Sequence, residues 1–286
     1  METITDLRPS PIAGQWYPGA AKRLSSSVEG YLEAAQLPEI EGEIIAVMAP
    51  HAGHIYSGPV AGYAFAALRG LEPDFVVVVS PMHHPYRESL LTSAHQAYKT
   101  PLGSIPIERE TIARLDACLQ AELGITLTAV RKDPEHSLEI ELPFLQQVFS
   151  TPFSLIPVMV REQTEPVARG LGKCLARVLE GRSAILVAST DLSHFYSQDM
   201  ANRLDKQVLS QVEAFDPEGV LRVEQQGKGF ACGRGALAAV MWAAKGLGAD
   251  TARVLKYATS GDVTGDLLQV VGYAAAVMTH SRSVGR

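Results

Sequence analysis

Histidines follow three strongly apolar segments of this sequence, each within a few residues of the segment's end. The three pairs are 43–49 with His51, 74–80 with His83, and 184–190 with His194. Apolar runs of this length, rich in valine and isoleucine, are typical of buried strands. Imidazoles bind metal ions and transfer protons near neutral pH. The sequence therefore places metal-binding or acid–base chemistry at strand ends.

Convergence of the three strand ends is the stronger argument. In open α/β sheets, ligands bind just outside the carboxyl ends of the strands. A single histidine after a strand is more often a hydrogen-bonding loop residue, but three at one edge favour a site. Asp191 precedes His194 by three residues and is placed to orient it or a neighbouring ligand. His84 either supports His83 through its ring N–H or faces a substrate.

Cys232 is the cysteine best placed for chemistry. It lies in "FACGRG" (230–235), just before a predicted helix at 233–248. The positive end of the helix dipole and the nearby Arg234 are expected to lower the pKa of this thiol. A thiolate binds metal or attacks carbon, whereas the alternative is a buried structural thiol.

The remaining cysteines and three of the histidines receive structural interpretations. Cys118 and Cys174 lie on apolar helical stripes and are predicted to be small core residues. An odd cysteine count without paired spacing favours a reduced, cytoplasmic interior over a disulfide framework. His54, His95 and His280 are predicted to be loop or surface residues.

The segment "EHSLE" (135–139) leaves two alternatives open. It can begin a helix in which Ser137 and Glu139 serve the cap. Alternatively, His136 points into a cleft. The longer segment 136–149 mixes strand-like and helix-like spacing, and we favour a helix.

Strand and helix patterns alternate along the rest of the chain. The predicted strands are 43–49, 74–80, 153–160, 184–190, 252–260 and 267–279, and the further predicted helices are 58–70, 109–124, 165–181, 197–215 and 216–227. This alternation predicts an α/β fold with a mostly parallel central sheet flanked by helices. We expect a single domain over residues 1–286.

Composition excludes several classes of function. The formal net charge is −6 and no Lys/Arg cluster is present, which argues against a nucleic-acid partner. No apolar run reaches the roughly 18 residues of a membrane helix, and the N-terminus does not read as a secretory signal. There is no P-loop, no G-x-S-x-G elbow and no CxxC pair.

Several blocks of the sequence, taken together, resemble a known family. They are, in order, "AGQWYP", "PHAGHIYSGPVA", "SPMHH", "TPLG", "EHSLEIELPFLQ", "STDLSHF", "ACGRG", "YATSGDVTGD" and "VVGYAA". They resemble the signature blocks of the Memo family, whose prokaryotic members are often called AmmeMemoRadiSam system protein B. The resemblance runs from Pro11 to Ala276, nearly the whole chain.

The resemblance implies a fold like that of the class III extradiol (LigB-type) dioxygenases and a metal site of two histidines and one cysteine. Carried over by motif, the metal ligands are His51, His83 and Cys232, the catalytic residues are His194, Asp191 and His136, and the substrate-binding residues are Trp16, Tyr56 and His84. The sequence departs from the common family pattern at His54, where tyrosine is usual, and at Met82, where serine is usual.

The implied chemistry is redox or dioxygenase-like activity on a small, unidentified substrate. Fe(II) is the expected cofactor, and the same donors also suit Cu or Zn. The alternatives are a metal-independent module that binds peptides or proteins in the same cleft, and a zinc-dependent hydrolase. The prokaryotic family name further implies a functional link to a radical-SAM protein and an AMMECR1-domain protein.

Overall fold

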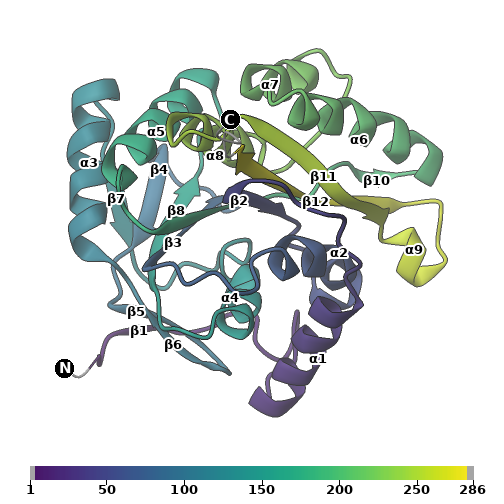
Figure 1. Ribbon diagram of the computed structural model, residues 1–286, viewed down its shortest axis with the longest axis horizontal. Helices are drawn as coiled ribbons and strands as arrows, with labels where there is room; N and C mark the ends of the chain where they lie inside the picture. Colours follow the sequence, from purple (N-terminus) through teal and green to yellow (C-terminus); the bar gives the residue numbers. More distant parts are fainter. Residues whose placement is uncertain (1–3, 282–286) are drawn as a thin grey trace, which may run out of the picture.

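A nine-stranded sheet runs through the middle of the protein in the computed structural model, which describes residues 4–281 (Figure 1). Its order is β10 (His194–Tyr196), β12 (Val270–His280), β2 (Glu43–Ala49), β9 (Ala184–Ser189), β3 (Phe75–Pro81), β8 (Ser154–Val160), β4 (Leu90–Ser93) and β7 (Leu127–Val130), and β11 (Thr251–Thr259) also pairs with β12. The central strands β2, β9, β3 and β8 are parallel, whereas β12 runs antiparallel to β2.

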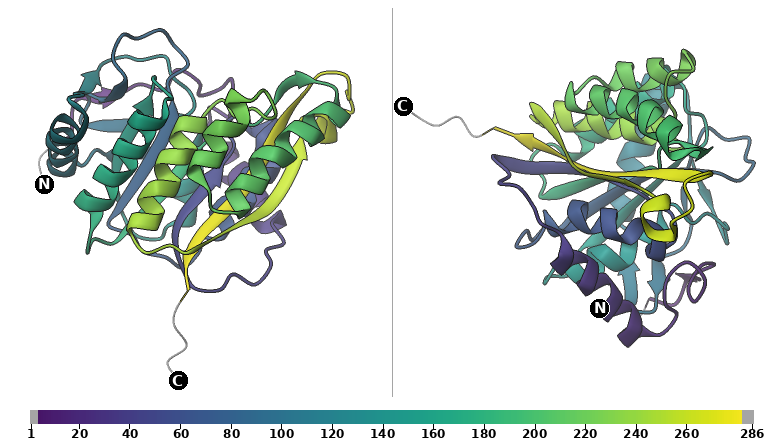
Figure 2. Two further views of the ribbon diagram at one scale, coloured as in Figure 1. Left: turned by 90° about the horizontal axis from the view of Figure 1, so that it is seen from above. Right: turned by 90° about the vertical axis from the view of Figure 1, so that its right-hand side faces the viewer.

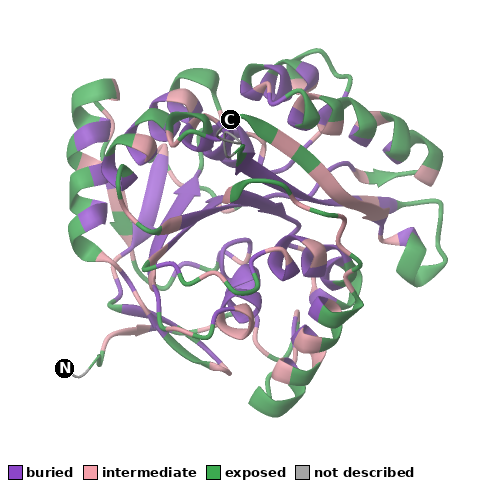
Figure 3. Cartoon of the chain, viewed as in Figure 1, coloured by how far each residue is buried: buried purple, intermediate pink, exposed green. Residues whose placement is uncertain are grey.

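The central strands are buried on both faces, which explains their unbroken apolar sequences. Val76 to Val79 of β3 are fully buried and pair with β9 on one side and β8 on the other. Figure 3 shows this buried centre of the sheet. The strands predicted at 43–49, 74–80, 153–160 and 184–190 are confirmed to within one residue at each end.

Helices cover both faces of the sheet (Figure 2). On one side lie α5 (Glu165–Leu179), α6 (Gln198–Glu213), α7 (Pro217–Gln225) and α8 (Arg234–Gly246), with α3 (Arg109–Leu123) beside α5; on the other lie α1 (Ala21–Ala34), α2 (His54–Ala66) and α4 (Leu142–Val148), the last preceded by the 3₁₀ turn η1 (Glu139–Glu141). The predicted α/β architecture with a mostly parallel sheet between helices is confirmed. None of the helices within residues 4–281 is long and apolar enough to cross a membrane.

Small residues allow the helices to approach closely. A Cβ at Gly172 of α5 would lie 2.6 Å from the carbonyl oxygen of Ala239 in α8. A Cβ at Gly62 of α2 would lie 2.4 Å from the carbonyl oxygen of Tyr31 in α1. Because these two positions lack a Cβ, α5 packs closely against α8 and α2 packs closely against α1. Helices α2 and α8 both begin beside strand ends that carry candidate site residues.

A second, three-stranded sheet was not predicted. It consists of β1 (Leu7–Arg8), β5 (Ala97–Thr100) and β6 (Gly103–Pro106), and its parallel β1–β5 pair anchors the N-terminal segment. Such short strands leave too few residues for an alternating pattern to be recognised. Helix α1 was missed as well, because three serines and Gly30 weaken its helical pattern. The "SGDVTGD" segment contains the short helix α9 (Gly261–Thr264).

The two cysteines predicted as free core residues form a disulfide. Cys118 of α3 and Cys174 of α5 are joined, with their Cα atoms 5.7 Å apart. The prediction of burial was right, but the prediction of free thiols was wrong, since packing of α3 against α5 brings together residues 56 positions apart. The cysteine count therefore no longer supports a reduced compartment.

Candidate metal centre

Three neighbouring parallel strands deliver polar side chains to one edge of the sheet. Strands β2, β9 and β3 lie side by side, and His51, Asp191 and His83 each stand two residues beyond the end of one of them. Since parallel strands end at the same edge, the three side chains start from one small area of backbone.

Three imidazoles meet at this edge. Ring nitrogens of His51, His83 and His136 all lie within 4.8 Å of one another. The ring centroids are 5.2 Å apart for His51 and His83, 5.5 Å for His51 and His136, and 4.9 Å for His83 and His136. His136 comes from the segment between β7 and η1, and its ring turns toward the other two imidazoles.

A polar atom holds the Nδ1 atom of each ring. The Nδ1 of His51 lies 2.9 Å from the Ser189 hydroxyl. Glu135 Oε1 lies 3.0 Å from the Nδ1 of His83 and 3.3 Å from that of His136. Metal-binding histidines characteristically engage their second ring nitrogen in this way, which fixes the tautomer and leaves Nε2 free.

Glu135 orients the rings of His83 and His136, a role that the sequence did not indicate. Its buried carboxylate also accepts hydrogen bonds from the backbone N–H groups of His83 (2.6 Å), His136 (2.9 Å) and Ser137 (2.9 Å). Burial alone would raise the pKa of Glu135, but the hydrogen bond and charge of His83, with help from His136, hold it below its usual range. No hydrogen bond from His84 occurs among residues 4–281, so Glu135 takes the orienting position considered for His84.

Burial favours the neutral form of two of the imidazoles. Burial, reinforced by the neighbouring imidazoles, lowers the pKa of His51 well below its ordinary value. Burial lowers the pKa of His136 to about 4. Neutral imidazole is the form that binds metal, so burial prepares both rings for a cation.

Cys232 lies against His51 but is not among the three residues whose donor atoms all lie within 4.8 Å of one another. Its Sγ is 3.1 Å from the Nε2 of His51 and accepts a hydrogen bond from the backbone N–H of Asp191 at 3.3 Å. The expected fall in its pKa was wrong: burial, together with the charge of Asp191, raises the pKa of this thiol. Arg234, expected to assist, pairs instead with Glu224 at 2.8 Å. The thiol thus needs a nearby cation to ionise.

Asp191 and His194 flank the cluster. Asp191 Oδ1 accepts the backbone N–H of His51 at 2.7 Å, and burial raises the pKa of Asp191 to about 7. His194 begins β10, outside the three-imidazole cluster, and burial lowers the pKa of its ring. Its Nε2 has no hydrogen-bond partner within the described part of the chain.

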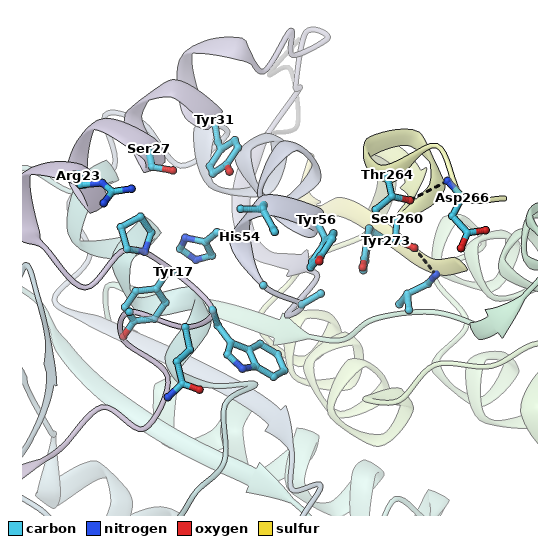
Figure 4. A pocket seen from close by; sticks show the side chains of 18 of the residues that line it. Tyr17, Arg23, Ser27, Tyr31, His54, Tyr56, Ser260, Thr264, Asp266 and Tyr273 are labelled. Atoms are coloured by element: carbon cyan, nitrogen blue, oxygen red, sulfur yellow. Dashed lines mark hydrogen bonds between the residues drawn. The ribbon is translucent and has the colours of Figure 1, made fainter. Parts of the chain in front are cut away.

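A groove of about 730 Å³ (Figure 4) adjoins the cluster, although none of the three clustered histidines lines it. Trp16 lines it, and the Trp16 ring lies 4.2 Å from that of His136. Tyr56, at the start of α2, also lines it and is partly exposed. The two aromatic residues proposed for substrate contact thus lie on the groove wall, and Trp16 connects the groove to the imidazoles.

Of the three histidines assigned to loops or the surface, only His54 contradicts the prediction, because it is buried at the start of α2. His54 is 1% exposed, its Nε2 lies 3.0 Å from the Ile140 carbonyl oxygen, and the rings of Tyr17 and Phe144 pack around it (Figure 4). His95 lies in a loop but is buried, with its Nδ1 2.8 Å from Asp6. The polar types of these residues concealed their structural roles, whereas His280 is exposed as predicted.

A family model and the similar curated proteins both point to one family. The family model described as "Memo-like protein" matches residues 8–277. A MEMO1 family protein of Nitrosopumilus maritimus is 33% identical over 274 residues, which cover 94% of this chain and 98% of that protein. A MEMO1 family protein of Methanopyrus kandleri is 36% identical over 281 residues, with the same two coverages.

Among solved structures, an uncharacterised protein of Escherichia coli K12 has a similar fold. The TM-score is 0.54 at 16% sequence identity, and the match covers 81% of this chain and 99% of that one. At this identity the likeness concerns the fold alone.

Proposed function

Because this chain belongs to the Memo family, we propose that it is a metalloprotein whose ion is held by His51, His83 and Cys232. One observation carries the proposal: the Nδ1 atoms of His51 and His83 are both engaged, and the Nε2 of His51 faces the Cys232 sulfur at 3.1 Å.

The donor set fits a metal ion. The buried ring of His51 has a depressed pKa and the buried thiol of Cys232 has a raised pKa, so the protein alone stabilises neither an imidazolium nor a thiolate there. A divalent cation would bind the neutral ring and stabilise the thiolate. Two nitrogens and one sulfur suit Fe(II), which is our first assignment, and Cu or Zn also tolerates them.

Fe(II) held by three protein donors would supply open positions for O₂ and a small substrate, which is the basis of the proposed redox or dioxygenase-like activity. His194, with an unpartnered Nε2, would move a proton to or from the substrate. Asp191 would hold the backbone of His51, and His136 would face the substrate beside Trp16. Trp16 and Tyr56 would orient an aromatic or otherwise planar group in the groove.

Elemental mass spectrometry of protein purified anaerobically tests the assignment. We expect near-stoichiometric iron in the wild type and in His194→Ala, and loss of iron in Cys232→Ser. A parallel His136→Ala variant separates this donor set from a three-histidine one: iron lost in His136→Ala but retained in Cys232→Ser would replace the thiolate by the third imidazole. Zinc at full occupancy would instead favour a hydrolase.

The groove supports a second candidate, a metal-independent binding module. Its volume lies within the range of small-molecule and peptide sites, and tyrosines and Trp16 line it. Protein that contains no metal after anaerobic purification and takes up none on titration would favour this candidate.

A further inference from the structure

Arg8 is a buried charged residue that does not belong to the imidazole cluster but is bonded to the loop that carries part of the candidate site. It lies in β1, is 1% exposed, and stacks over the ring of Tyr98 at 4.7 Å. A guanidinium at this depth is costly unless its donors are satisfied. The hydrogen-bond partners of the guanidinium therefore indicate which part of the structure Arg8 stabilises.

All of these partners belong to one short stretch, residues 133–139. Arg8 donates to both carboxylate oxygens of Asp133, at 2.9 and 2.7 Å, and to the Glu139 carboxylate at 2.5 Å. It also donates to two backbone carbonyl oxygens, those of Asp133 at 3.2 Å and Glu135 at 2.7 Å. One side chain thus fixes both ends of the stretch and its middle.

The stretch has no helix or strand of its own before η1, so side-chain contacts must define its path. It is also where Glu135 and His136 are found. Arg8 bonds the backbone of Glu135, and the side chain of Glu135 holds the ring of His83. A shift of this backbone would move the Glu135 carboxylate away from both imidazoles that it orients.

We propose that Arg8 is a positioning residue for the metal centre, acting through the backbone of Glu135 and His136 rather than by contact with the ion or the substrate. The N-terminal segment adds to the same support, since the Tyr17 hydroxyl donates to Glu139 at 2.7 Å and Trp16 covers His136. The inference rests on the proposed function, because it assigns a role toward that metal centre.

Two variants test the role without relying on one that may unfold. Arg8→Lys keeps a positive charge among the carboxylates but has a single nitrogen and cannot reach all of the partners of Arg8. The triple variant Arg8→Met, Asp133→Asn, Glu139→Gln removes the charges together, so that no buried carboxylate is left unpaired. Arg131→Met is the matched control, since Arg131 is exposed and pairs with Asp6 outside this stretch.

Two measurements decide the outcome, with circular dichroism confirming that each variant is folded. In Co(II) titrations we expect both Arg8 variants to bind about tenfold more weakly, as is common when residues behind metal ligands are changed, and Arg131→Met to bind like the wild type. In metal-free protein, long-range ¹H–¹⁵N spectra should show one fixed tautomer for His83 in the wild type and a mixture in the Arg8 variants.

The two measurements separate the inference from the function on which it rests. Folded Arg8 variants with the wild-type Co(II) affinity and the wild-type His83 tautomer would overturn the positioning role. A wild type that binds no Co(II) would overturn the metal assignment. In that event the tautomer of His83 still decides whether Arg8 orders this loop.

Discussion

The sulfur of Cys232 lies 3.1 Å from the Nε2 of His51, although the two residues are 181 positions apart in the chain. The thiol is buried and its pKa is raised, while burial keeps the His51 ring neutral. The pair is therefore a protonated thiol facing an imidazole, and a cation between them would have to displace the thiol proton.

Metal binding should consequently release about one proton per ion from Cys232 at pH 7. We expect Cys232→Ser to release none and to bind Zn(II) at least tenfold more weakly. Titration of metal-free protein with Zn(II) in weakly buffered solution containing an indicator dye measures the release. Equal release in the two proteins would show that the thiol is not a ligand.

The two tryptophans should respond differently to a metal ion. Trp16 contacts His136 at 4.2 Å between ring centroids, whereas Trp242 lies on α8 under Arg169. A paramagnetic ion such as Co(II) or Cu(II) should therefore quench mainly Trp16. In a fluorescence titration, we expect Trp16→Phe to abolish most of the quenching and Trp242→Phe to leave it, and the reverse pattern would place the ion elsewhere.

His54 should make stability depend on pH. Burial lowers its pKa to about 4, against an ordinary value of about 6.5 in the unfolded chain. The unfolded state thus binds the proton first, so the stability contributed by the neutral ring is complete above pH 6.5 and is lost as the pH falls toward 4. The loss attributable to His54 is about 3 kcal/mol.

Urea unfolding between pH 4 and 7 measures this contribution. His54→Phe, which suits the surrounding aromatic rings, should flatten the profile, whereas the exposed His280→Gln should leave it unchanged. Parallel profiles for the wild type and His54→Phe would mean that His54 protonates normally in the folded protein.

The Cys118–Cys174 disulfide should contribute to stability independently of the metal centre. A cross-link closing a loop of this length is worth about 4 kcal/mol in the chain-entropy treatment, and measured values are often lower. We expect Cys118→Ala/Cys174→Ala to lower the free energy of unfolding by about 2 to 4 kcal/mol without changing Zn(II) affinity. Alkylation under denaturing, non-reducing conditions should label Cys232 alone, and labelling of all three cysteines would contradict the disulfide.

Sequence patterns predicted the parts of the fold that repeat over many residues. The valines of β3 and the apolar runs of β2, β8 and β9 identified the parallel sheet, because strands buried on both faces need continuous apolar sequence. The order of these strands placed His51, His83 and Asp191 at one edge, since each follows a strand end. Elements of two to four residues, such as β1 and β5, carry too little pattern to be recognised.

The supports of the candidate site could not be read from sequence in the same way. Glu135 opens a segment that can be a helix start, and its contact with His83 depends on a loop path that Arg8 bonds from more than a hundred positions away. Burial reversed the expected pKa shift of Cys232, because the desolvation of a thiol depends on all of its neighbours rather than on one helix end. Both the contact of Glu135 and the pKa of Cys232 are set by the folded structure, not by the local sequence.

The proposed metal ligands lie far apart in the sequence, so they are synthesised at different times. His51, His83 and His136 leave the ribosome well before Cys232, which joins them only when α8 begins to pack under the sheet. A growing chain that already holds these histidines therefore still lacks the sulfur of the proposed donor set. On the proposed assignment, the set would be complete only after synthesis, so the metal available at that time would decide which ion the finished protein binds.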